Sequence, residues 1–230
     1  IIKHKLSSLG FTEIYNSSLV SEDLFSKAKM DIEPSLKLQN PLSNEHEYLR
    51  RSLIPNLLQN IKENQNHQEQ PLYLFELANI YLPRGKNDLP EEKPILTLVT
   101  DKIDFRHHKG LVESLLDNLK IRKLKFSPLD HESLTWDINS TAHIYSGKNY
   151  LGLLGKPSSQ VLDNFGLTKD VFVTNLDVST ISNLCSSIHH GKPLPKYPSV
   201  IEDITVQSNK KIGELIKKIK NAESEAKDII

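Results

Sequence analysis

A chain of 230 residues with 37% hydrophobic content is long enough to bury a sizeable core. Lys plus Arg and Asp plus Glu each number 29, so the net charge is zero and no global field attracts nucleic acid or an anionic membrane. The single cysteine, Cys185, excludes an internal disulfide and a Cys-x-x-Cys zinc site, and the lack of a long apolar run excludes a membrane span. We therefore expect a soluble, cytoplasmic protein, and we interpret the chain as an excised segment of a longer one.

The N-terminal region predicts short elements. Apolar residues recur at helical spacing over residues 1–9, and Gly10 follows as a helix stop. A strand is expected over residues 11–19, and Ser21 is expected to cap a second short helix. An extended stretch is expected over residues 36–39.

A core-facing helix is expected to begin near Ser52. Asn40-Pro41 forces non-helical backbone upstream of it, and Pro55 is tolerated in its first turn because the N–H there has no intrahelical partner. One side of this helix is apolar and the other is expected to face solvent. The apolar side consists of Leu53, Ile54, Leu57, Leu58 and Ile61, and the polar side of Asn60, Glu63, Asn64 and Asn66.

The middle of the chain is dominated by strand patterns. Strands are expected over residues 72–82, 95–100, 141–145, 150–154 and 171–176. A helix is expected around residues 111–119 and another after the last strand, while residues 146–149 suit a hairpin turn. Strands joined by such short links predict an α+β fold with a mainly antiparallel sheet.

The composition changes near Gly191, where GKPLPKYP reads as a linker. We expect a core domain over residues 1–190, a linker over 191–199, and the beginning of another domain over 200–230. That last part should contain a strand at residues 201–206 and a helix at 211–221, a pair too small to bury its own apolar face.

Several blocks resemble one family. Residues 40–65 read NPLSNEHEYLRRSLIPNLLQNIKENQ, residues 74–81 read LFELANIY, and residues 104–110 read DFRHHKG. In this order and spacing they are similar to the phenylalanyl-tRNA synthetase beta subunit family. The resemblance covers nearly the whole chain, although Arg51 replaces the usual Thr and Ala78-Asn79 the usual Gly.

This resemblance implies a class II aminoacyl-tRNA synthetase-like antiparallel sheet flanked by helices, followed by an incomplete ferredoxin-like βα segment of an anticodon-binding domain. For the whole enzyme it implies ATP and Mg²⁺, tRNA-Phe, and an alpha subunit in an α₂β₂ assembly. It also assigns structural or interface roles to a set of signature residues. These are Asn40, Pro41, Ser43, Arg50, Ser52, Pro55, Phe75 and Glu76.

The family resemblance also predicts a catalytically silent segment. Active class II enzymes bind ATP through Phe-Arg-x-Glu at a strand end, where Arg stabilises the developing phosphate charge. Here the strand end reads Tyr81-Leu82-Pro83-Arg84, with Leu in the Arg position. We therefore expect no catalytic, cofactor-binding or metal-binding residue in this segment. A two-residue slip that brings Arg84 into use stays open as the minor reading.

Other candidate residues have a simpler explanation. His107-His108 and His189-His190 could suggest a metal, but adjacent histidines point apart on a helix or strand, so we expect solvated side chains. Glu76 could be a general base, but a scaffold role is favoured.

Arg50 suits either an interface salt bridge or a surface pair. The basic helix edge formed by Lys217, Lys218 and Lys220 is a weak candidate for tRNA contact.

Three functional hypotheses are compatible with these features of the sequence. The favoured one is a pseudo-catalytic scaffold of the phenylalanine-tRNA ligase beta subunit, which should expose an apolar surface when isolated. The alternatives are an autonomous class II adenylate-forming enzyme, recognisable by ATP binding, and a stand-alone RNA-binding module, recognisable by salt-dependent tRNA binding.

Overall fold

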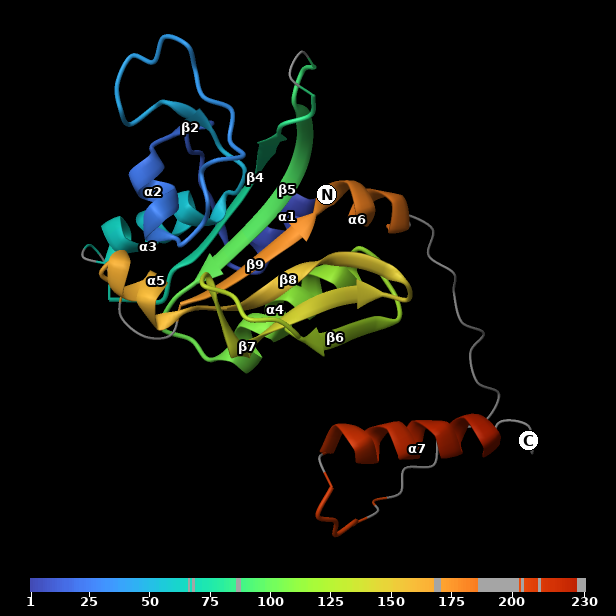
Figure 1. The fold of residues 1–230 in the computed structure, drawn as a ribbon. Helices are drawn as coiled ribbons and strands as arrows, with labels where there is room; N and C mark the ends of the chain where they lie inside the picture. The colour runs from blue at the N-terminus through green and yellow to red at the C-terminus, as the bar shows by residue number, and fades with distance from the viewer. Residues whose placement is uncertain are drawn as a thin grey trace. The chain divides into compact units, whose positions relative to one another are not determined.

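The computed structural model describes residues 1–65, 67, 69–85, 88–167, 171–185, 203, 205–210 and 212–226. Contacts group the chain into two units, residues 1–189 and residues 190–230. The described part of the first unit contains a seven-stranded sheet (Figure 1). In spatial order its strands are β1 (Thr12–Glu13), β4 (Tyr73–Leu82), β5 (Glu91–Thr100), β9 (Phe172–Asp177), β8 (Asn149–Pro157), β7 (Trp136–Ser146) and β6 (Leu124–Pro128).

Neighbouring strands of this sheet are antiparallel except for the parallel pair β1 and β4. The mainly antiparallel α+β arrangement is thus confirmed. A second, two-stranded sheet pairs β2 (Leu19–Val20) with β3 (Tyr48–Leu49). The helices of the first unit are α1 (Ile2–Ser8), α2 (Glu22–Lys27), α3 (Ile54–Gln65), α4 (Phe105–Asn118), α5 (Ser159–Asn164) and α6 (Val178–Leu184).

Apolar clusters cover both faces of the central strands. On one face, Leu57, Leu58 and Ile61 of α3 belong to a buried cluster with strand residues such as Val99 and Val173. The other cluster joins α1, α4 and α6 to the sheet. It includes Leu6, Leu115, Leu116, Phe75, Leu98, Leu176 and Ile181. Burial on both faces explains why β5 is apolar over consecutive residues rather than alternating.

Local signals explain the helix starts. The Ser21 hydroxyl accepts a hydrogen bond from the N–H of Leu24 at 3.2 Å, as expected of a cap. Asp104 accepts one from the N–H of His107 at 2.7 Å. Pro55 is the second residue of α3, where its missing N–H is harmless. The apolar side predicted for α3 is confirmed, because all five of its residues are buried.

Several of the element predictions needed correction. Residues 11–19 do not form one strand but two short ones, β1 and β2, separated by residues 14–18. β3, β6 and α5 were missed, since each spans only two to six residues and carries a weak apolar pattern. The hairpin prediction is confirmed, with Gly147 at φ 59° in the turn between β7 and β8.

In the second unit the structure describes helix α7 (Ile212–Ala226), which confirms the expected helix and extends it. The expected strand at residues 201–206 is absent at its described positions, Asp203, Thr205 and Val206. No described strand pairs with these positions, and an unpaired strand leaves its N–H and C=O groups without partners. The linker predicted at residues 191–199 lies outside the described residues. Among the described helices, none is long and apolar enough to cross a membrane.

Candidate functional site

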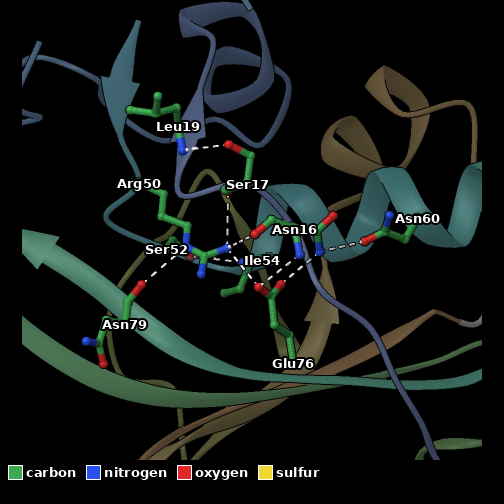
Figure 2. Close-up of polar contacts among 9 residues, drawn as sticks. All are labelled: Asn16, Ser17, Leu19, Arg50, Ser52, Ile54, Asn60, Glu76 and Asn79. Carbon is green, nitrogen blue, oxygen red and sulfur yellow. Dashed lines mark hydrogen bonds and ion pairs between the residues drawn. The ribbon is translucent and has the colours of Figure 1, made fainter. Parts of the chain in front are cut away.

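A buried ion pair lies at the centre of the signature residues. Arg50 follows β3, Glu76 lies on β4, and their side chains are only 2% and 1% exposed. Arg50 Nη1 lies 2.8 Å from Glu76 Oε1 (Figure 2). Since a lone buried charge is strongly unfavourable, each of these two residues depends on the other.

Arg50 also joins backbone segments that are distant in sequence. Its Nη1 donates to the carbonyl oxygens of Ser17 at 3.3 Å and Asn16 at 3.4 Å, and its Nε donates to that of Asn79 at 3.2 Å. Its own carbonyl accepts from the N–H of Tyr81 at 2.9 Å. The guanidinium therefore ties the segment after β1 to strand β4, as Figure 2 shows.

Both carboxylate oxygens of Glu76 also accept hydrogen bonds from other parts of the chain. Its Oε2 accepts from Asn16 Nδ2 at 2.8 Å, and its Oε1 accepts from the N–H of Asn16 at 3.3 Å in addition to Arg50. Asn16 Nδ2 also donates to Asn60 Oδ1 of α3 at 2.9 Å. Both oxygens of this carboxylate already accept hydrogen bonds from the chain and are poorly placed to contact a substrate, which supports the scaffold role of Glu76.

This network explains why the expected strand over residues 11–19 is interrupted. The carbonyl groups of Asn16 and Ser17 are directed to Arg50 and are thereby removed from a strand ladder. Asn60 was expected to face solvent, but it is half-buried and accepts a hydrogen bond from Asn16. Asn16 and Asn60 were missed as site residues, because no local pattern marks a contact across 44 residues of sequence.

The remaining signature residues lie elsewhere. Asn40, Pro41 and Ser43 belong to an irregular loop in which Asn40 and Ser43 are exposed. The Ser43 hydroxyl lies 3.2 Å from His46 Nδ1 within that loop. These three residues therefore do not join the ion pair.

Ser52, Pro55 and Phe75 have packing or capping positions. The Ser52 hydroxyl accepts from the N–H of Ile54 at 3.2 Å, at the start of α3. Pro55 is buried in the first turn of α3. Phe75 is buried in the cluster on the opposite face of the sheet from α3. Only Arg50 and Glu76 of the eight signature residues meet in a charged contact among the described atoms.

The end of β4 has a chemistry unlike that of a phosphate site. Leu82 is the last residue of the strand and pairs with Glu91 of β5. Arg84 Nη2 lies 3.8 Å from a carboxylate oxygen of Glu91, and the two side chains are 59% and 48% exposed. Glu92 lies one residue further along β5. An approaching phosphate would therefore meet carboxylates and a cation that already has a partner.

The prediction of solvated histidines is wrong for His108. Its ring is buried and bridges two hydroxyls, with Nδ1 2.8 Å from Thr100 Oγ1 and Nε2 2.7 Å from Thr174 Oγ1. Burial, together with the neighbouring His107, lowers the pKa of His108 to about 3. His107 is exposed, as expected. His189 and His190 lie outside the described residues.

The basic edge proposed for tRNA contact lies on α7. Lys218 is exposed there, whereas the side chains of Lys217 and Lys220 lie outside the described part of the chain. The helix also exposes Ile212, Ile216 and Ile219. Its described surface is therefore mixed, with apolar as well as basic side chains.

Comparison with known proteins identifies the family. The model of the phenylalanyl-tRNA synthetase beta chain CLM domain matches residues 1–178. The chain belongs to this family. The beta subunit of phenylalanine–tRNA ligase from Clostridium acetobutylicum is 27% identical over 227 residues, which cover 96% of this chain and 28% of that protein. The beta subunit from Dehalococcoides mccartyi is 30% identical over 224 residues, which cover 92% and 27%. The chain thus spans less than a third of the length of these beta-chain relatives.

Solved structures confirm the fold expected of this beta-chain family member. A pyrrolysyl-tRNA synthetase from Desulfitobacterium hafniense matches with a TM-score of 0.64 at 14% identity, over 79% of this chain and 67% of that one. A second structure of that enzyme matches with a TM-score of 0.63, over 81% and 70%. The seven-stranded sheet with its flanking helices is therefore a class II synthetase fold.

Proposed function

We propose that this chain is the pseudo-catalytic core of a phenylalanine-tRNA ligase beta subunit. In this role it assembles with the catalytic alpha subunit in an α₂β₂ enzyme that aminoacylates tRNA-Phe in the cytoplasm. ATP and Mg²⁺ serve the whole enzyme, and this segment holds neither. The observation that carries the proposal is the end of β4, where Leu82 occupies the position that the family resemblance assigns to the required arginine and Arg84 is paired with Glu91.

The buried ion pair supports the same role. Adenylate formation needs a cation aimed at developing phosphate charge. Arg50, the fully buried cation near β4, instead has its guanidinium engaged by Glu76 and by carbonyl groups. Arg50 is therefore committed to contacts within the fold and is not available to a nucleotide.

We further propose a core domain over residues 1–190, a linker over 191–199, and the start of a ferredoxin-like anticodon-binding domain over 200–230. Lys217, Lys218 and Lys220 are candidate tRNA contacts in that last segment. The exposed position of Lys218 on α7 is consistent with such a role.

The test has two parts. The chain alone should show no ATP binding by calorimetry at millimolar nucleotide. When co-expressed with the alpha subunit, it should co-purify, and Phe-dependent pyrophosphate exchange should require the alpha subunit. Micromolar ATP affinity of the chain alone that Arg84→Ala abolishes would establish the autonomous-enzyme alternative instead. Arg122→Ala, which removes another exposed, ion-paired arginine, is the matched control.

A further inference from the structure

A second polar cluster lies outside the Arg50–Glu76 network. Asp130 and His131 follow strand β6, and His143 lies on the neighbouring strand β7. His131 Nδ1 is 3.0 Å from Asp130 Oδ1, and His143 Nε2 is 4.0 Å from the same oxygen. One ligand-type atom from each residue lies within 4.8 Å of the other two. Two imidazoles and a carboxylate therefore converge on one point of the surface.

We propose that Asp130, His131 and His143 form a binding site for a divalent transition-metal ion, with Zn²⁺ as the best fit. Tetrahedral bonds of about 2.0–2.2 Å place neighbouring ligand atoms about 3.3–3.6 Å apart, close to the spacing found here. Small side-chain rotations therefore suffice to bring the three atoms onto an ion. Two nitrogen ligands favour zinc over Mg²⁺ or Ca²⁺, which prefer oxygen ligands alone.

The scaffold around the cluster restricts its side chains. His143 is paired through the backbone with Ser127 of β6 and Leu153 of β8, so its strand is fixed on both sides. Its ring packs edge-on against Tyr150, with centroids 5.6 Å apart. The His131 ring stacks on the His143 ring at 6.1 Å and 30°. The two imidazoles are therefore already side by side without an ion.

The loop that carries the other two ligands is anchored as well. The N–H of Leu129 donates to the carbonyl of Thr141 on β7 at 3.0 Å, and the Leu129 side chain is buried. This anchor lies directly before Asp130. It holds the loop over β7, where His143 is found.

Exposure and hydrogen bonding set the expected affinity. The side chains of Asp130 and His131 are 85% and 65% exposed, so an ion can enter, and water or an added ligand can complete its coordination. Within the described structure, His143 Nδ1 is buried and has no hydrogen-bond partner. Histidine ligands usually donate that second N–H, and lacking such support weakens metal sites about 10–100-fold. We expect a reversible surface site rather than a structural one.

The test is Zn²⁺ titration of the 230-residue chain in a buffer that does not bind zinc. His131→Ala and Asp130→Asn change exposed side chains and should preserve the fold, so each isolates metal binding from stability. Each should weaken Zn²⁺ binding at least about tenfold. His143→Ala should do the same, with its thermal unfolding measured alongside. His107→Ala removes an exposed histidine of α4 and should leave the affinity unchanged.

Co²⁺ provides a second readout that is independent of affinity. Visible absorption bands of nitrogen- and oxygen-coordinated Co²⁺ should appear with the unaltered chain and disappear with the double variant His131→Ala/His143→Ala. Zinc binding of equal strength in that double variant would overturn the proposal, because the ion would then be held elsewhere. Undetectable zinc binding by the unaltered chain would overturn it as well.

Discussion

At the residue scale, the Arg50–Glu76 pair shows how a charge can be buried safely. Removing two charges from water costs several kcal/mol per ion, and the attraction between them offsets this only when the remaining polar atoms are also partnered. Here Asn16 and backbone carbonyls complete the shell around both groups. The pair therefore fixes how the segment after β1 packs against β4, and removal of either side chain should destabilise the fold.

We expect Glu76→Ala to destabilise the chain by about 3–5 kcal/mol, because it leaves the Arg50 charge buried without a counterion. Urea unfolding followed by circular dichroism measures this effect. The double variant Arg50→Met/Glu76→Leu should cost clearly less than the sum of the single variants, since it removes both charges together. Strict additivity, or a loss below about 1 kcal/mol in Glu76→Ala, would contradict the ion-pair argument.

His108 predicts a pH-dependent stability. The pKa of His108 is about 3 in the folded chain and about 6.5 in the unfolded chain. Between these two pH values the unfolded chain binds a proton at this histidine and the folded chain does not. The contribution of neutral His108 to the free energy of unfolding is therefore complete above the unfolded pKa and is lost as the pH falls toward the folded pKa. Between about pH 7 and about pH 5 the loss amounts to about 2 kcal/mol.

This dependence can be measured by urea unfolding at several pH values. His108→Gln should remove the His108 part of the slope, and His4→Gln, at an exposed histidine of α1, should keep it. An unchanged slope in His108→Gln would show that other groups cause the pH dependence.

At the element scale, close backbone packing decides where the sheet tolerates a side chain. Gly152 of β8 has φ 152°, and a Cβ placed there would lie 2.0 Å from the carbonyl oxygen of Asn175 on β9. Gly110, inside α4, has nothing within 4 Å of an added Cβ. The two glycines therefore serve opposite purposes, although both appear in the sequence as isolated glycines within regular elements.

Gly152→Ala should destabilise the chain by about 3 kcal/mol or prevent folding, because the backbone of β9 cannot move away from the added methyl group without breaking its pairing with β8 and β5. Gly110→Ala should stabilise it by about 0.5–1 kcal/mol, because alanine restricts the unfolded chain and is a better helix former. Thermal unfolding of both variants compares them directly. Equal effects of the two substitutions would refute this assignment.

At the scale of the whole molecule, both apolar clusters of the sheet are built from residues within the first unit. The second unit contributes none of the described core residues, and its helix α7 exposes the isoleucines of its apolar side. A class II sheet that is covered on both faces can fold as a scaffold in its own right.

A chain that ends at residue 189 should therefore fold with a free energy of unfolding within about 0.5 kcal/mol of the 230-residue chain. Denaturant unfolding of the two proteins gives the comparison. A drop of several kcal/mol on truncation would show that the second unit supports the first.

Much of this fold could be predicted from the sequence. The apolar side of α3, the cap at Ser21, the hairpin at Gly147 and the long strand β4 all follow from periods and residue types within a few positions. The blocks around Arg50 and Glu76 also carried the family resemblance, and the matching family model and the class II structures confirm it. Three short elements, β3, β6 and α5, were missed because so few residues carry little pattern.

The sequence by itself determined the family, the α+β class and the leucine at the end of β4, because each depends on residue type and local spacing. Only the tertiary structure decided that Arg50 and Glu76 meet, that Asn16 interrupts the first strand, and that His108 is buried. Apart from Thr100, which is eight residues from His108, the partners in these contacts lie 26 to 66 residues away in the chain. Hydrogen bonds and desolvation over such separations arise from packing, which no local pattern encodes.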